Sequence, residues 1–277
     1  MEHFLADDGE KIHLRISGEG PPMILLHGWT SSHRDWNPFL AAFEAHHRVF
    51  RWDARGHGGH PTHGTPTAAR MARDLQNLLD HYRLDGAVVV GHSMGALTLW
   101  QYLRDFGDRR LSKVVFIDQS PRLVTDAGWR NGIYGDFDAA RNARFIRDLE
   151  ADFAEAVLRL VAFGHNPRAR TAYEDDIPAI QNARQRLAAL DPRPLIDCWA
   201  SLTAADYRDV LATITVPALL VYGGASNFYG TGTAHYVRDS IPNALLHVYP
   251  EVDHAPHLWE RERFARDVLD FLGDGPG

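Results

Sequence analysis

Short apolar runs alternate along the chain with longer segments of helical periodicity, and this alternation restricts the possible folds more than any other feature. Six such runs are present, at 23–27, 48–52, 87–90, 114–117, 218–222 and 245–249. Most are continuously apolar rather than alternating with polar residues, which is typical of strands buried on both faces of a parallel sheet. Between these runs, residues 71–82 and 97–106 carry apolar side chains at helical spacing, and residues 264–272 do so after the last run. The pattern predicts an α/β fold: a mostly parallel central sheet flanked by helices.

Two further segments fill in this architecture. Residues 4–16 contain two strand-like runs around an Asp-Asp-Gly turn and predict a β-hairpin. Residues 121–205 carry no strand pattern, and apolar side chains at helical spacing recur within 145–161 and 180–190. We therefore predict a core made of residues 1–120 and 206–277, and a helical cap at 121–205 inserted between two core strands.

Composition and charge exclude several classes of protein. The 277 residues include 29 basic and 36 acidic side chains, for a net charge of −7, which argues against a nucleic-acid or anionic-membrane partner. No apolar run approaches the ~18 residues of a membrane helix, and residues 1–4 lack the features of a secretory signal. The lone Cys198 cannot form an internal disulfide, which fits a reducing compartment. We expect a cytoplasmic protein with a small-molecule partner and leave open a homo-oligomer.

The strongest chemical signal is the pentapeptide Gly91-His92-Ser93-Met94-Gly95. It fits the pattern G-x-S-x-G, follows a predicted strand and precedes a predicted helix, which is the structural context this motif requires. A serine on such a sharp turn projects above the sheet edge, and the glycines let neighbouring backbone approach closely. The helix N-terminus favours developing negative charge nearby. We predict that Ser93 is a nucleophile.

The segment His27-Gly28-Trp29 follows the run at 23–27 and predicts a turn beside that serine. The glycine frees the chain to turn, so the next backbone N–H can point at the reacting centre. Together, the backbone N–H groups of Trp29 and Met94 would then form an oxyanion hole.

A serine nucleophile needs a base, and among sixteen histidines position selects His254. It follows the last strand-like run and precedes the final helix. His257 is the reserve candidate, but it lies nearer that helix, where a structural role is favoured.

Four motifs occur in the order found in one known family: HGW at 27–29, DARGHG at 53–58, GHSMG at 91–95 and DH at 253–254. Through them the chain resembles the α/β-hydrolase fold family over nearly its whole length, and within it the serine esterases and cofactor-free haloperoxidases with a helical cap. The resemblance implies Ser93 as nucleophile, His254 as base, and Trp29 and Met94 as oxyanion donors. It is weakly informative about the substrate.

The sequence departs from that family at the acid. Family members usually carry it just after the strand matching 218–222, where this chain has Ser226 and no carboxylate between 223 and 237. Some members take the acid from the end of the preceding core strand, where this chain has Asp118. A carboxylate there would face the same rim as the nucleophile and could reach the histidine. A turn or capping role for Asp118 is the alternative. Asp253 ranks below it, since side chains adjacent in an extended loop tend to diverge.

Other motifs argue against cofactors. There is no G-x-G-x-x-G and no G-x-x-x-x-G-K-[ST], which disfavours dinucleotide and P-loop sites. His57, His60 and His63 form H-x-x-H-x-x-H, but a metal site would need further oriented ligands, so we predict no metal. Asp53 and Arg55 are interpreted as tying down a glycine-rich loop.

These residues together predict a cofactor-free serine esterase that cleaves small or medium, fairly apolar carboxylic esters through an acyl-enzyme. The same machinery serves lactones, thioesters and perhydrolysis, and a ligand-binding pseudo-hydrolase remains an alternative from a different class. Six aromatic residues are candidates for an apolar acyl pocket, of which we expect two or three to face the substrate: Trp129, Phe137, Phe145, Phe153, Phe163 and Trp199.

Overall fold

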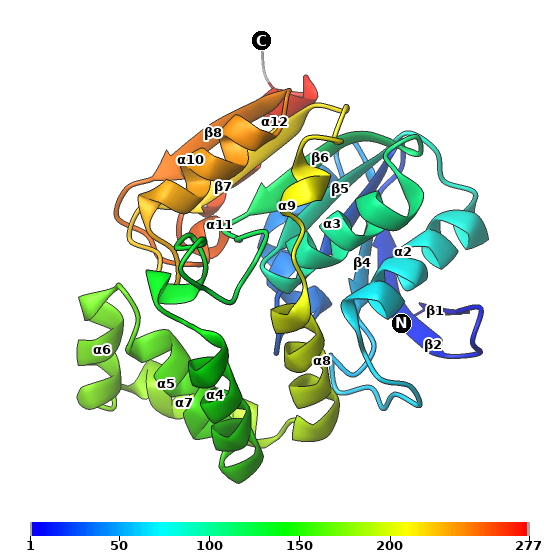
Figure 1. The fold of residues 1–277 in the computed structure, drawn as a ribbon. Helices are drawn as coiled ribbons and strands as arrows, with labels where there is room; N and C mark the ends of the chain where they lie inside the picture. Colours follow the sequence, from blue (N-terminus) through cyan, green and yellow to red (C-terminus); the bar gives the residue numbers. More distant parts are fainter. Residues whose placement is uncertain (1, 276–277) are drawn as a thin grey trace.

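A computed structural model describes residues 2–275 and contains one eight-stranded sheet (Figure 1). The strands are β1 (Glu2–Leu5), β2 (Lys11–Ser17), β3 (Pro22–Leu26), β4 (Arg48–Asp53), β5 (Ala87–His92), β6 (Leu111–Ile117), β7 (Ala218–Gly223) and β8 (Ala244–Tyr249). Their order is β1-β2-β4-β3-β5-β6-β7-β8. The β1–β2 and β2–β4 pairs are antiparallel, and every other pair is parallel. The predicted mostly parallel α/β sheet is confirmed, including the N-terminal hairpin.

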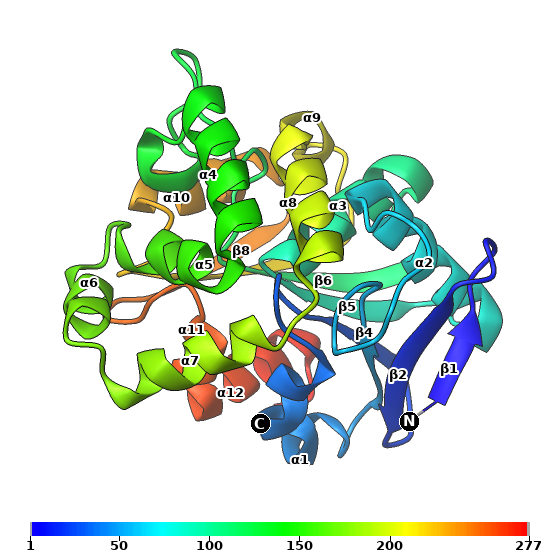
Figure 2. The same cartoon turned by 90° about the horizontal axis from the view of Figure 1, so that it is seen from below.

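Helices cover both faces of the sheet, as Figures 1 and 2 show. Those outside the segment between β6 and β7 are η1 (His33–Phe39), α1 (Leu40–Phe43), α2 (Ala68–Tyr82), α3 (Met94–Phe106), α10 (Thr231–Ser240), α11 (Pro256–Trp259) and α12 (Arg261–Leu272). Helices α2, α3 and α10 belong to one apolar cluster, and η1, α1 and α12 belong to the other.

Strand side chains alternate between these two clusters. In β3, Ile24 and Leu26 join the cluster of α2 and α3, whereas Met23 and Leu25 join the cluster of α12. All four are fully buried. Continuously apolar strands therefore result from a sheet that has no solvent-facing side in its centre.

The chain between β6 and β7 forms a helical insertion. Its elements are η2 (Ile133–Gly135), α4 (Ala139–Ala151), α5 (Phe153–Ala162), α6 (Pro167–Glu174), α7 (Pro178–Ala188), α8 (Pro192–Ala204) and α9 (Arg208–Leu211). The helical spacing within 145–161 is divided between α4 and α5, because Asp152 leaves the helical conformation and its carboxylate caps the N–H of Glu155.

The insertion lies at the edge of the sheet where β6 ends. Figures 1 and 2 show α4 to α8 beside the carboxyl ends of the central strands. The indole N–H of Trp29, in the loop after β3, donates to the carbonyl of Leu195 in α8 at 2.9 Å. The insertion is thus tied directly to the loops that carry the candidate residues. Within residues 2–275, no helix has both the length and the apolar character needed to cross a membrane.

Candidate active site

Ser93 lies at the turn between β5 and α3 in a strained backbone conformation. Its φ of 51° and ψ of −113° lie in a region that non-glycine residues rarely adopt. Glycine flanks it for steric reasons: a Cβ on Gly91 would lie 2.6 Å from the carbonyl carbon of Gly95, and one on Gly95 would lie 2.3 Å from the carbonyl oxygen of Leu26. Close packing of strand against helix therefore produces the sharp turn that exposes the serine hydroxyl.

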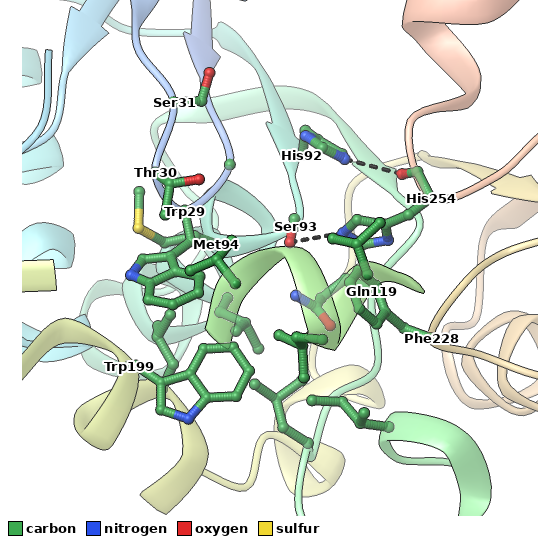
Figure 3. Close-up of a pocket in the computed structure, with 18 of the residues that line it drawn as sticks. Trp29, Thr30, Ser31, His92, Ser93, Met94, Gln119, Trp199, Phe228 and His254 are labelled. Carbon is green, nitrogen blue, oxygen red and sulfur yellow. Dashed lines mark hydrogen bonds between the residues drawn. The ribbon is translucent and has the colours of Figure 1, made fainter. Parts of the chain in front are cut away.

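The imidazole of His254 lies between Ser93 and Asp118. Figure 3 shows its contact with Ser93. His254 is in the loop between β8 and α11. Its Nδ1 is 2.6 Å from Asp118 Oδ2, and its Nε2 is 2.9 Å from Ser93 Oγ. Because an ionised carboxylate can only accept, Nδ1–H donates to Asp118, which leaves the Nε2 lone pair to accept from the serine hydroxyl. The arrangement can remove a proton from Ser93.

Asp118 follows β6 directly and is completely buried, with a φ of 43°. Besides His254, two groups donate to its carboxylate: Gly223 N–H to Oδ1 at 3.0 Å and Ser226 Oγ–H to Oδ2 at 2.7 Å. Burial raises the pKa of this carboxyl above its ordinary value, and the hydrogen bonds from His254, Ser226 and Gly223 oppose that shift. Ser226, at the position where the family usually has its acid, is thus a hydrogen-bond partner of Asp118.

The loop after β7 links the insertion to His254 through Asn227. The Asn227 side chain accepts from the backbone N–H of His254 at 3.3 Å and donates to the carbonyl of Val161 in α5 at 3.1 Å. The sequence pattern did not point to Asn227 or to a contact of Ser226. The feature that marked this loop in the sequence was that it lacks the acid found there in the family.

The reserve candidates lie elsewhere. The Asp253 carboxylate accepts from Ala255 N–H and from the indole N–H of Trp259, each at 2.9 Å. His257 is fully buried, and among residues 2–275 neither of its ring nitrogens has a hydrogen-bond partner. Neither residue is placed beside Ser93 in the manner of His254 and Asp118.

Trp29 and Met94 lie on the other side of Ser93 from His254 (Figure 3). Met94 is the first residue of α3, so its N–H has no intrahelical acceptor. Within residues 2–275, neither this N–H nor that of Trp29 donates to another group of the chain. Two free donors beside the candidate nucleophile are what an oxyanion would require.

His92 is a site residue that sequence analysis did not single out, although it lies inside the pentapeptide motif. Its Nε2–H donates to the carbonyl of His254 at 3.0 Å, and this hydrogen bond is drawn in Figure 3. Burial lowers the pKa of His92 well below its ordinary value, so the ring stays neutral. This bond holds the His254 backbone against the turn that carries Ser93.

Ser93 and His254 open into a cavity of about 190 Å³. Its walls are mostly apolar: Leu97, Leu123, Ile133, Val157, Leu160, Val161, Trp199, Leu202 and Phe228. A larger groove of about 1110 Å³ lies outside it, between α5 to α7 and the loops after β3, β4, β7 and β8. The two spaces adjoin, because they share the lining residues Thr30, Ser31, Asp35, Val157 and Val161.

Fewer of the six aromatic candidates face the cavity at Ser93 than the two or three expected. Of the six aromatic candidates only Trp199 lines the cavity at Ser93. Phe137, Phe145 and Phe163 instead line a separate groove along α4 and α5. The packing of the insertion turns their side chains away from the serine.

The histidines at 57, 60 and 63 do not converge on a common point. His57 is buried beside His27, and His60 stacks on His13 with ring centroids 3.8 Å apart. Within the described residues no group of three or more His, Cys, Asp or Glu side chains is arranged to hold a metal ion.

Asp53 and Arg55 both anchor loops by hydrogen bonds. Asp53 accepts from the backbone N–H of His33 at 2.7 Å, and Arg55 pairs with the buried carboxylate of Asp74 at 2.6 Å. These contacts agree with the structural role expected for the segment 53–58.

Comparison with known proteins identifies the family. The sequence profile of the alpha/beta hydrolase fold matches residues 21–261. The chain belongs to the alpha/beta hydrolase fold family. The resemblance inferred from the four motifs is therefore confirmed.

Relatives of this alpha/beta hydrolase include esterases. A pimeloyl-(acyl-carrier protein) methyl ester esterase from Vibrio vulnificus is 29% identical over 265 residues, which cover 95% of this chain and 98% of that protein. Among solved structures, an esterase from Exiguobacterium antarcticum has a TM-score of 0.84 at 23% identity, covering 98% of both chains. A bromoperoxidase from Bacillus anthracis has a TM-score of 0.81 at 24% identity, covering 99% of this chain and 100% of that one. At such identities the two structural likenesses show a shared fold.

Proposed function

We propose that this alpha/beta hydrolase is a serine esterase that cleaves carboxylic esters through an acyl-enzyme. The observation that carries the proposal is the continuous hydrogen-bonded series from Asp118 through His254 to Ser93 at the wall of an apolar cavity. Each member has the partner that its role requires, and the buried carboxylate fixes the imidazole tautomer.

The reaction follows from this geometry. Ser93 attacks the ester carbonyl while His254 takes its proton at Nε2, and the N–H groups of Trp29 and Met94 stabilise the oxyanion. His254 then returns the proton to the leaving alcohol. Asp118 stabilises the imidazolium between these steps. Water hydrolyses the acyl-enzyme by the same route, and no step requires a metal or an organic cofactor.

Cavity size supports small or medium, fairly apolar substrates. About 190 Å³ beside Ser93 accommodates a short acyl or alcohol group, and its mostly apolar lining favours groups without charge. The insertion supplies Val157, Leu160, Trp199 and Leu202 to this lining, which supports a role as a cap over the site.

A serine-directed phosphonate and a panel of esters test the proposal. We expect one equivalent of label on the peptide that contains residues 91–95, and turnover of p-nitrophenyl esters that is lost in Ser93→Ala. Lactones, thioesters and peracid formation assayed on the same preparation identify the preferred acyl donor. Labelling without turnover of any acyl donor would indicate a ligand-binding pseudo-hydrolase, and turnover that survives Ser93→Ala would contradict the acyl-enzyme.

A methyl ester at the end of a long acyl chain is the second candidate. The adjoining inner cavity and outer groove favour it, because a small methoxy group suits the former and a long chain suits the latter. The curated relatives act on such a molecule, a pimeloyl-(acyl-carrier protein) methyl ester, according to their names. Methyl pimelate joined to a pantetheine thioester should then be cleaved faster than methyl acetate. Ala183→Trp, which narrows the outer groove, should slow only the long substrate, with Ala183→Ser as control.

A further inference from the structure

Gln119, next to Asp118 in the chain, carries a buried amide that the mechanism above does not use. The residue is only 2% exposed, yet its side chain lines the cavity at Ser93. The lining also includes Tyr229, whose hydroxyl is bonded to Gln119, whereas Thr30, Ser31 and Asp35 are shared with the outer groove. A buried polar group in an apolar wall is costly unless its hydrogen bonds are made.

The orientation of this amide is fixed by its partners. The backbone N–H of Ser120 donates to Gln119 Oε1 at 2.7 Å, and the hydroxyl of Tyr229 donates to the same atom. A backbone N–H cannot accept, so the atom that it contacts must be the oxygen. Burial keeps the Tyr229 hydroxyl protonated by raising its pKa well above the ordinary value. The Tyr222 hydroxyl holds the backbone carbonyl of Gln119 in addition.

The amide nitrogen is consequently left with two protons to donate. Within residues 2–275, neither proton is donated to another group of the chain. Figure 3 shows the amide beside Ser93 and His254, with its nitrogen on the side of the serine. In this view Trp29 and Met94 lie to the left of Ser93, whereas the Gln119 amide lies below it, so its side-chain donor is distinct from their backbone N–H groups.

We infer that Gln119 is a specificity-determining residue that donates a hydrogen bond from Nε2 to a neutral oxygen of the substrate, beyond the scissile carbonyl. This inference rests on the proposed ester hydrolysis and adds a requirement to its substrate: an ether, hydroxyl or carbonyl oxygen in the acyl or the alcohol portion.

The charges around the cavity favour a neutral oxygen over a carboxylate. No lysine or arginine lines the inner cavity, whereas Asp35 lines it and the buried Asp118 precedes Gln119 in the chain. A carboxylate in this position would lose its hydration without gaining a cation. A neutral oxygen loses less hydration free energy than a carboxylate, and the amide donor replaces the hydrogen bond that it made to water.

Matched ester pairs that differ by one oxygen test the inference. On the acyl side, p-nitrophenyl methoxyacetate is compared with p-nitrophenyl butanoate. On the alcohol side, 2-methoxyethyl butanoate is compared with butyl butanoate. For each pair we define the oxygen preference as the kcat/KM of the ester with the extra oxygen divided by that of its partner. Comparing this ratio between wild type and variant cancels the difference in intrinsic reactivity between the two esters. The pair that responds identifies which portion of the substrate Gln119 contacts.

Two substitutions separate donation from mere structural support. Gln119→Met removes both donors and the acceptor, whereas Gln119→Glu keeps an oxygen for Ser120 and Tyr229 but replaces the donor. We expect the oxygen preference to fall roughly 3- to 10-fold in both variants for at least one pair. Restoration of the wild-type ratio by Gln119→Glu would indicate a structural role and overturn the inference.

Two further outcomes are distinguishable. Leu202→Ile alters the same cavity without changing donors, so it should change both esters of a pair alike. Unchanged ratios in both Gln119 variants and both pairs would overturn the role of Gln119 while ester hydrolysis stands. Absence of Ser93-dependent turnover of any ester would instead overturn the proposed function.

Discussion

Replacing Asp118 with asparagine should disable the base without unfolding the protein. Gly223 N–H can only donate, so the amide oxygen of the new residue must take the place of Oδ1. The amide NH₂ then takes the place of Oδ2 and faces His254 Nδ1. Two donors cannot face each other, so Nδ1 must become the acceptor and the proton must move to Nε2. Ser93 would then meet an N–H group in place of a lone pair.

The expected loss of kcat is large because the substitution removes an interaction that stabilises the transition state. Loss of the charge and of the correct tautomer at a triad aspartate costs ~10⁴ in kcat with geometry preserved, equivalent to about 5.5 kcal/mol of transition-state stabilisation. Stability should change much less. Burial already raises the pKa of the Asp118 carboxyl, so removing the charge also removes a desolvation cost.

Kinetics on a p-nitrophenyl ester, with thermal unfolding measured in parallel, provide the assay. Ser226→Ala is the matched control: it removes one hydrogen bond to the same oxygen and should cost tenfold or less. The double variant Asp118→Asn/Ser226→Asp should recover at least tenfold over Asp118→Asn, because a carboxylate at 226 would extend toward His254 Nδ1. If Asp118→Asn stays within tenfold of wild type, the reasoning about the tautomer is wrong.

Three other predictions follow from the same residues. His254→Ala should lose several powers of ten in kcat, whereas His257→Ala should keep substantial rate, and the reverse ranking would reassign the base. His257→Phe should flatten the acid dependence of stability. Burial lowers the pKa of His257 to about 3, so between pH ~6.5 and 3 the unfolded chain binds a proton that the folded chain does not. This histidine therefore removes ~1.4 kcal/mol of unfolding free energy per pH unit as pH falls. If the free energy of unfolding, measured by denaturant titration, falls as much between pH 6 and 4 in His257→Phe as in wild type, this reasoning is wrong. A chelator should leave ester turnover unchanged; loss restored by zinc would contradict a metal-free mechanism.

The sheet was predictable because its strands are buried on both sides. Each continuously apolar run corresponds to a strand, and residues 71–82 correspond to α2. Helix α10 was not predicted. Its ten residues bury only Thr233, Ala234 and Val237, so no broad apolar stripe is present. Packing against the sheet, rather than local pattern, determines that helix.

Part of the candidate site could likewise be predicted from the sequence and part could not. Sequence order selected Ser93 and His254, because a nucleophile after one strand and a base after the last strand meet at the same edge of a parallel sheet. The role proposed for Gln119 could not be found by pattern, nor could the fact that Trp199 is the one of the six aromatic candidates that faces the cavity. Which side chains of the insertion face the cavity depends on how its helices pack, and helical spacing cannot distinguish one buried face from another.

The position of the acid shows why a missing motif can still be informative. Strands β6 and β7 are adjacent and parallel, with Ile117 paired to Val221, and the N–H of Asp118 donates to the Val221 carbonyl at 2.9 Å. The ends of both strands therefore lie within reach of the same imidazole. The chemistry requires a carboxylate oxygen at one point in space, beside His254 Nδ1, and either strand end can supply it. Here Asp118 supplies the oxygen. The last residue of β7, Gly223, supplies an N–H and the loop after β7 supplies the hydroxyl of Ser226, and both bind the same carboxylate. An acid absent from one loop thus predicts a carboxylate on the neighbouring strand, with the vacated position supporting it.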